Sequence, residues 1–207
     1  MMYARSSTVN GNPQNVDRAT AYLRDKVMPA VQGLDGFVGL SLLADRNSGR
    51  CIATTSWRDE AAMHDSEGPL HQLRSRYGEI LGGRAEVQEW EIAVVHRTRP
   101  SPEGACARVV WSRRDPRNED RALDVFRLAV IPRLEELRGF CSVSMLVDRE
   151  TARAVSSTVY ESRDAMERAS EHALPLRQEF VRSMGGEITD VAEFDLVLAH
   201  LRVPETV

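Results

Sequence analysis

The sequence predicts an α+β fold made of two tandem βαββαβ domains. The first observation behind this prediction is an internal repeat: residues 36–46 read GFVGLSLLADR, and residues 139–149 read GFCSVSMLVDR. The two stretches are 103 residues apart (36 to 139), about half of the 207-residue chain. Self-similarity at a fixed distance is the signature of a repeated structural unit.

The second observation is the order of elements in the first half. Runs of apolar and β-branched residues, bounded by Gly, Pro, Asn or Asp, predict strands over 3–9, 37–44, 50–57 and 87–95. Apolar residues at helical spacing predict a helix over about 15–34. A second helix should begin after Asp59 as its N-cap, be interrupted at Gly68-Pro69 and resume over 70–81. We also expect Pro29 to kink or loosen the first helix, because proline removes a backbone donor.

The second half repeats this plan after a Pro- and Gly-containing linker. Asp115-Pro116 has the chemistry of a helix start, Pro132 stands 103 residues after Pro29, and Ser162 should cap a second broken helix. We therefore expect a first domain over 1–98, a linker over 99–105 and a second domain over 106–207.

The third observation is that both faces of the strand 37–44 are largely apolar. A four-stranded antiparallel sheet with helices on one side should have a polar outer face. Burial of an apolar side chain stabilises by roughly 1.5–3 kcal/mol, so the free faces of the two sheets should pack together. The predicted fold class is thus two ferredoxin-like domains that form an intramolecular pseudo-dimeric α/β barrel.

Composition limits the classes of partner. The net charge of −4 and the pI near 5.8 lack the basic footprint of nucleic-acid or acidic-membrane binding. No apolar run has the length of a membrane span or the pattern of a signal peptide. The three cysteines (Cys51, Cys106, Cys141) read as buried free thiols of a reducing compartment, which predicts a cytoplasmic protein.

The chain resembles the antibiotic biosynthesis monooxygenase family of dimeric α+β barrels in three features. These are the βαββαβ order, the Gly-Phe-x-x-x-x-Leu-Leu strand and the segment 55–63, TSWRDEAAM. The second half keeps the pattern in 158–166, TVYESRDAM. Members of that family form homodimers, and this chain resembles such a dimer fused into one polypeptide. The resemblance implies a monomer with an internal pseudo-dimer, with a homodimer as the alternative.

That family includes cofactor-free oxygenases, heme-degrading oxygenases, isomerases and proteins without known activity. The heme-degrading members use Asn on the first strand, and Trp and His on the broken helix. Here the first strand offers Ser6, Ser7 and Thr8, and only the histidines at His71 and His172 match. We therefore expect no cofactor. Heme is the alternative, although the residue motif of the heme-degrading members is incomplete here. The sequence also contains no metal-ligand spacing.

His71 and His172 are the candidate catalytic residues, because a histidine needs only a small shift of its pKa to titrate near neutral pH; the alternative is a histidine on a helix surface.

Aromatic residues can line a flat hydrophobic pocket, and the candidates for ligand binding are Trp57, Tyr77, Tyr160 and Phe180. Packing is the alternative role of Trp57 and Tyr160. His96 and His200, at the ends of the last strands, are expected to make hydrogen bonds rather than to bind a shared ligand.

Three hypotheses follow. The first is a monooxygenase-like protein that binds a small hydrophobic or aromatic molecule between helices and sheet and oxygenates it with a histidine base and without a cofactor. The second is a non-catalytic binder of such a molecule. The third is a stress-related structural barrel. A fold alone does not decide among them.

Overall fold

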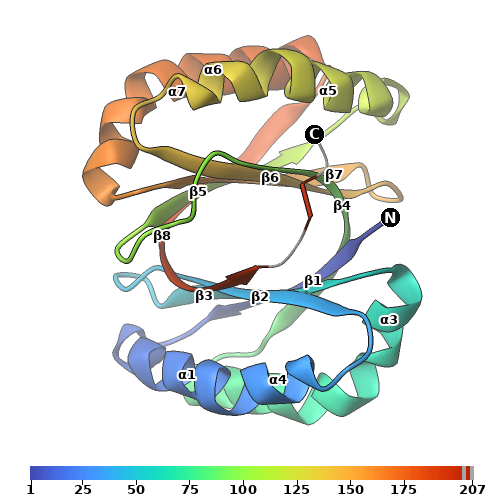
Figure 1. Cartoon of the computed structure of the whole chain (residues 1–207), viewed down its shortest axis with the longest axis vertical. Helices are drawn as coiled ribbons and strands as arrows, with labels where there is room; N and C mark the ends of the chain where they lie inside the picture. Colours follow the sequence, from blue (N-terminus) through green and yellow to red (C-terminus); the bar gives the residue numbers. More distant parts are fainter. Residues whose placement is uncertain (202–203, 206–207) are drawn as a thin grey trace. The chain divides into compact units, whose positions relative to one another are not determined.

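The computed structural model describes residues 1–201 and 204–205 of the chain, and the chain forms two compact units (Figure 1). Unit 1 comprises Met1–Trp90 and Phe194–Val203, and unit 2 comprises Glu91–Glu193 and Pro204–Val207. Each unit therefore includes a segment from the other half of the sequence. Among the described residues, no helix is both long and apolar enough to cross a membrane.

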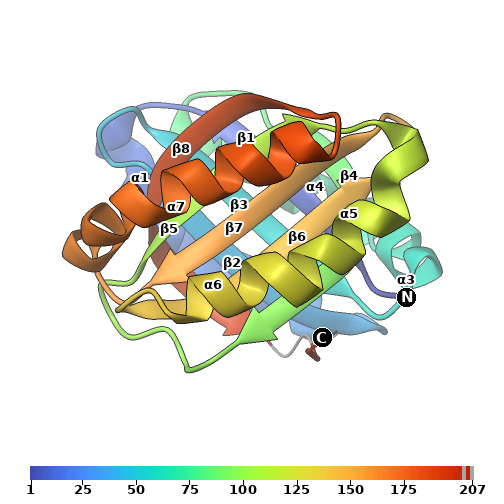
Figure 2. The same cartoon turned by 90° about the horizontal axis from the view of Figure 1, so that it is seen from above.

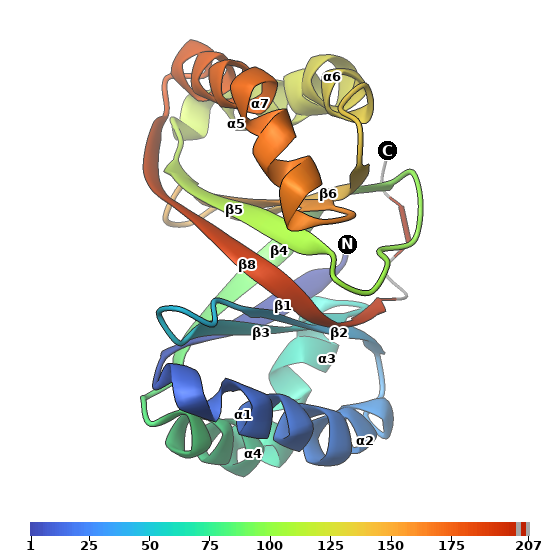
Figure 3. The same cartoon turned by 90° about the vertical axis from the view of Figure 1, so that its left-hand side faces the viewer.

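Unit 1 is an antiparallel sheet with helices on one face. Its strands are β1 (Tyr3–Asn10), β2 (Phe37–Ala44), β3 (Arg50–Trp57), the first part of β4 (Glu86–Arg97) and the last part of β8 (Glu187–Leu201). Strand β3 pairs with β1 and β2, and β2 also pairs with β8 from Gly39↔Leu201 to Ala44↔Asp195. Figure 3 shows the last part of β8 along β2.

The helices of unit 1 are α1 (Val16–Tyr22), α2 (Met28–Gln32), α3 (Glu60–Asp65) and α4 (Glu67–Leu81). In Figure 1, α1 and α4 lie side by side under one face of the sheet. Val31 and Tyr77 from these helices, and Leu23 between α1 and α2, pack with Leu40 and Leu42 of β2 in one buried cluster. The apolar residues that predicted the first helix therefore face the sheet.

Unit 2 has the corresponding layers. Its strands are β5 (Cys106–Arg113), β6 (Phe140–Asp148), β7 (Arg153–Tyr160) and the remaining parts of β4 and β8. Strand β7 pairs with β5 and β6, and β6 pairs with β4. The helices α5 (Glu119–Val125), α6 (Ile131–Glu135) and α7 (Arg163–Ser183) lie over one face of these strands (Figure 2).

The first helix of each half is loosened ahead of its proline, as predicted. Between α1 and α2, residues Leu23–Val27 form a π-helical turn; between α5 and α6, Phe126–Val130 form the same turn. Pro29 and Pro132 stand two residues after the last residue of these turns. A proline has no amide hydrogen and its ring conflicts with the carbonyl four residues earlier, so the wider turn accommodates it.

The repeated Gly-Phe pair has a steric cause. Gly36 and Gly139 have φ values of 75° and 91°, a region that glycine enters without a Cβ penalty. A Cβ at Gly36 would also collide with Ala62, and one at Gly139 would collide with Ala165. The turn into the second strand of each half therefore requires glycine.

The second helix differs between the halves. Asp59 and Ser162 cap it as predicted, by accepting hydrogen bonds from the backbone amides of Ala62 and Ala165. In the first half the break falls at Ser66 and not at Gly68-Pro69, since Pro69 lies in the first turn of α4, where proline is tolerated. The expected break in the second half is wrong: α7 is continuous over 21 residues, with Pro175 inside it.

The predicted fold class is also wrong in its central feature. The described strands follow one closed hydrogen-bonded order, β1-β3-β2-β8-β5-β7-β6-β4, and do not form two separate tandem βαββαβ domains whose sheets meet by their faces. Strands β4 and β8 have 12 and 15 residues, beyond the usual range of roughly 3–10 residues, and each belongs to both units. Unpaired strand edges are unfavourable, and the prediction considered only the burial of apolar strand faces.

A buried ion cluster fixes the start of α5 in unit 2. The carboxylate of Glu119, which is 6% exposed, lies 2.9 Å from Nη1 of Arg149 and 3.4 Å from Nη2 of Arg114. These contacts are ionic rather than well-directed hydrogen bonds, because Oε1 of Glu119 and the Arg114 nitrogens have no hydrogen-bond partner among the described residues. Burial lowers the pKa of Arg114, and Glu119 opposes that shift.

We expect Glu119→Gln to lower the free energy of unfolding by roughly 3 kcal/mol, because it leaves the buried Arg114 without its counter-charge, whereas Arg149 keeps Glu91 at 2.7 Å. Urea denaturation at pH 7 measures this loss. The control is Asp120→Asn, whose side chain is 90% exposed and also faces Arg149; it should change stability by less than about 0.5 kcal/mol. Equal losses in the two variants would contradict the role of burial.

Candidate functional site

Unit 2 contains a cleft between its helices and the face of its sheet, which we call the unit-2 cleft. Its empty volume is about 650 Å³, including space open to solvent. The apolar wall comes mainly from the helices, with Phe126, Val130 and Leu134 on one side and Leu176 and Phe180 of α7 on the other. The rings of Phe126 and Phe180 are 5.5 Å apart and tilted.

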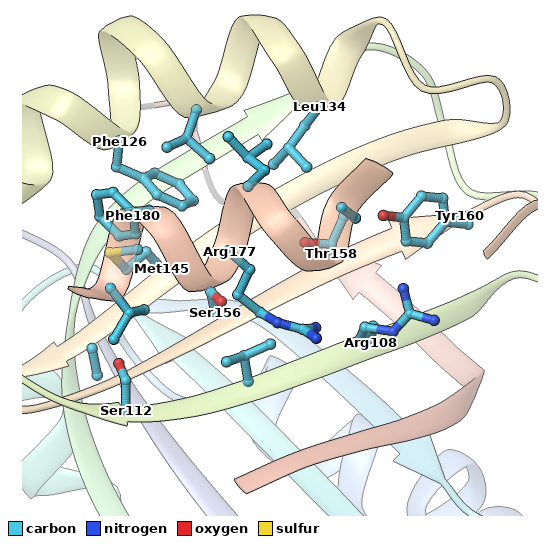
Figure 4. Close-up of a pocket in the computed structure, with 16 residues that line it drawn as sticks. Arg108, Ser112, Phe126, Leu134, Met145, Ser156, Thr158, Tyr160, Arg177 and Phe180 are labelled. Carbon is cyan, nitrogen blue, oxygen red and sulfur yellow. The ribbon is translucent and has the colours of Figure 1, made fainter. Parts of the chain in front are cut away.

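Two arginines supply the strongest polar character of this cleft. Arg108 projects from β5 and is buried (8% exposed). Its Nη2 donates to Oε1 of Glu193 at 2.6 Å and to Oγ of Ser170 at 2.6 Å. Arg177 projects from α7, and Figure 4 shows both guanidinium groups on the same side of that helix.

Arg177 has fewer hydrogen-bond partners than Arg108. Its Nε is buried and has no hydrogen-bond partner among the described residues. Burial lowers the pKa of Arg177, and repulsion from Arg108 lowers it further, while Tyr160 and Glu193 act in the opposite direction. Arginine side chains carry their positive charge in proteins, so the cleft contains a cation at this position.

Unit 1 has a corresponding cleft of about 440 Å³, the unit-1 cleft. Its arginines, Arg5 on β1 and Arg74 on α4, are both paired. Glu67 accepts two hydrogen bonds from Arg74 at 2.9 and 3.0 Å and lies 3.0 Å from Nη1 of Arg5. Arg5 also binds Glu89 at 2.5 Å. The cations of this cleft are neutralised within the unit.

The predicted ligand-binding residues lie at or beside these clefts. Tyr160 and Phe180 line the unit-2 cleft, and Tyr77 lines the unit-1 cleft. Trp57 is fully buried, packs edge-on against Phe37 and donates from Nε1 to Thr55 at 3.1 Å; it is not among the lining residues of the unit-1 cleft. Their binding role stays a prediction.

The two candidate histidines lie outside the clefts. The His71 side chain is 68% exposed, and its Nδ1 is 3.7 Å from Glu67. His172 is exposed on α7. Neither lines the cleft of its own unit, so a histidine base would act only on a part of a ligand that extends out of the cleft.

The predicted strand-end hydrogen bond of His96 is confirmed, with Nε2 2.6 Å from Oε1 of Glu135. His200 stacks on Phe37, with ring centroids 6.4 Å apart. Among the described residues, no group of three or more His, Cys, Asp or Glu side chains is arranged to hold a metal ion.

The lining of the unit-2 cleft does not fit a heme. Heme iron is held by His, Cys, Tyr or Met, and this lining offers only Met145 and Tyr160. Burial raises the pKa of Tyr160, which disfavours the tyrosinate that iron would need.

Sequence reasoning missed the four cleft arginines. Arg5 and Arg108 each stand in a strand-like run, as Arg108 does in CARVV, whereas Arg74 and Arg177 stand in helical segments. The repeat relates Arg5 to Arg108 and Arg74 to Arg177 at the same distance of 103. A charged residue retained at equivalent inward positions of both halves was the available signal. For Arg5 and Arg108, the alternation of side chains along a strand places the arginine on a buried face.

The pairing of Glu67 generates a pH-dependent contribution to stability. The hydrogen bonds from Arg74 hold the pKa of Glu67 below its ordinary value of 4.5. A lowered carboxyl pKa stabilises the fold above the unfolded-state pKa, and this contribution is lost as the pH falls through the folded-state pKa.

We expect Glu67→Gln to lower the free energy of unfolding at pH 7 by only about 0.5 kcal/mol, because the Glu67 side chain is 45% exposed and its charge is screened. At pH 3 the difference from the unsubstituted protein should shrink. Urea midpoints at the two pH values measure it. A difference that grew on acidification would show that the sign of the shift is wrong.

Comparison with solved structures shows the fold. The chain matches FN1347 of Fusobacterium nucleatum with a TM-score of 0.72 and 11% identity over 97% of this chain and 94% of that one. It matches an anthrone oxidase-like protein with a TM-score of 0.68 and 14% identity, over 98% and 94%. A ferredoxin-fold protein of Listeria monocytogenes, described as related to antibiotic biosynthesis monooxygenases, gives 0.53 and 11%, over 99% and 96%.

No family model matches the chain, so the resemblance to the antibiotic biosynthesis monooxygenases holds for the fold. Two proteins of Mycobacterium tuberculosis are much closer in sequence. Rv2557 is 47% identical over all of this chain and 92% of its own length, and Rv2558 is 49% identical over all of this chain and 88% of its own. The chain belongs to the family of Rv2557 and Rv2558.

Proposed function

We propose that this chain is a monooxygenase-like protein that binds a small hydrophobic or aromatic molecule in the unit-2 cleft. The observation that carries this proposal is the apolar cleft itself, with Phe126 and Phe180 in its wall and about 650 Å³ of empty space. The fold shared with an anthrone oxidase-like protein and with a relative of the antibiotic biosynthesis monooxygenases supports it. The three buried free cysteines support a reducing, cytoplasmic location.

The reaction that suits such a cleft without a cofactor begins with an acidic CH₂ group that is conjugated to a ketone through aromatic rings, as in anthrone. A base removes one proton, and the carbanion transfers electrons to O₂. One oxygen atom then becomes a carbonyl on that carbon, and the other leaves as water with the two displaced hydrogens. The cleft excludes water from the carbanion, and the base supplies the proton transfer.

A non-catalytic binder in the same cleft is the second candidate. The observation that favours it is the exposure of His71 and His172, neither of which lines the clefts. The histidine base therefore stays a prediction, whereas ligand binding requires only the apolar lining.

Binding is tested by filling the cleft. Ser156 and Ala53 are half-buried lining residues at equivalent repeat positions of the unit-2 and unit-1 clefts. With N-phenyl-1-naphthylamine as a neutral fluorescent probe, Ser156→Leu should weaken binding about tenfold or more, since the added side chain occupies ligand space. Ala53→Leu is the matched control and should leave the dissociation constant unchanged. Unaltered binding in Ser156→Leu would remove the cleft as the ligand site.

Catalysis is tested with anthrone and an oxygen electrode. If His71 or His172 is the base, its replacement by Ala should lower the rate of oxygen consumption roughly 10²–10⁴-fold, with an unchanged melting temperature because both side chains are exposed. Full activity in both variants would exclude the histidine base. No oxygen consumption by the unsubstituted protein, together with probe binding, would favour the non-catalytic binder.

A further inference from the structure

The two clefts can be compared position by position, because their lining residues are related by the repeat distance of 103. The pairs are Arg5 and Arg108, Thr55 and Thr158, Leu73 and Leu176, Arg74 and Arg177, and Tyr77 and Phe180. Both clefts thus keep a first-strand arginine, a helix arginine and an apolar wall. What differs between them is the counter-charge.

In unit 1 the helix arginine is neutralised by Glu67, which holds Arg74 through two hydrogen bonds. The equivalent of Glu67 in unit 2 is Ser170. Ser170 accepts a hydrogen bond from Arg108 and donates one to the carbonyl of Met166 at 3.1 Å, but it brings no negative charge. The substitution of serine for glutamate removes the carboxylate from the unit-2 cleft.

No other carboxylate takes its place. Glu193 is shared by Arg108 at 2.6 Å and Arg163 at 3.6 Å. Among the described residues, Arg177 has no ion pair, and its buried Nε has no hydrogen-bond partner. A cation that is half-buried against apolar side chains without a partner is unfavourable for the fold, so its presence is better explained by something it binds.

We propose that the unit-2 cleft binds a hydrophobic carboxylate, with Arg177 as the counter-ion of the carboxylate group and the wall of Phe126, Val130, Leu134 and Phe180 around its apolar body. The bound carboxylate takes the role that Glu67 has in unit 1. A planar guanidinium matches a carboxylate with two parallel hydrogen bonds. This inference rests on the proposed function, because it names the class of ligand in the same cleft.

The test compares two probes of the same shape, anthracene-9-carboxylate and the neutral anthracene-9-carboxamide, on the full chain at pH 7. Fluorescence titration should give tighter binding of the carboxylate by on the order of 10- to 100-fold, the range of a charge-assisted hydrogen bond. Arg177→Met should abolish that preference while keeping the affinity for the amide within about twofold. Its melting temperature should stay equal or rise, since an unpaired buried charge is removed.

Two further variants locate the effect. Ser170→Glu restores the internal carboxylate of unit 1 and should lower the affinity for the carboxylate probe toward that for the amide, although Arg177 is intact. Arg74→Met, the matched change in the unit-1 cleft, should leave both affinities unaltered.

The outcomes separate the two proposals. Equal binding of both probes by the unsubstituted protein, or a carboxylate preference that survives Arg177→Met, overturns the carboxylate site and leaves hydrophobic ligand binding intact. Failure of both probes to bind removes the cleft as a ligand site and the proposed function with it.

Discussion

The need of a buried arginine for a counter-charge organises both units of this protein. Arg5 and Arg108 each project from a sheet strand to the inner face, where few charged side chains are tolerated unless they are paired. The partner comes from the last strand of the unit's sheet, as Glu89 for Arg5 and Glu193 for Arg108. These pairs tie β1 to β4 and β5 to β8 beside the clefts, and they set the polar end of each cleft.

The same requirement explains how equivalent clefts can differ in use. In unit 1 the two arginines pair with two glutamates, Glu67 and Glu89, so the positive charges of the cleft are balanced by carboxylates of the same unit. In unit 2 a serine stands at the position of the first glutamate, and the helix arginine lacks its partner. At this one position, unit 1 has a glutamate that pairs with Arg74, and unit 2 has a serine beside an arginine whose buried Nε has no hydrogen-bond partner among the described residues.

The helices carry the apolar part of each cleft through a shared backbone device. The π-helical turns Leu23–Val27 and Phe126–Val130 precede the prolines and contribute Leu23, Val27, Phe126 and Val130 to the lining. Such turns occur often at functional sites because they widen the helix locally. In unit 2 the larger Phe126, in contact with Phe180, makes the wall aromatic.

The sequence by itself determined the order of strands and helices, the caps at Asp59 and Ser162, and the loosened helix before Pro29 and Pro132. These features depend on neighbouring residues, whose backbone preferences are local. Only the tertiary structure decided which strands pair, because β4 and β8 find their partners through long-range hydrogen bonds that no local pattern specifies. It also decided that His71 is exposed and that Arg177 has no carboxylate partner in the part of the chain that the structure describes, since burial and charge pairing depend on residues far apart in the chain.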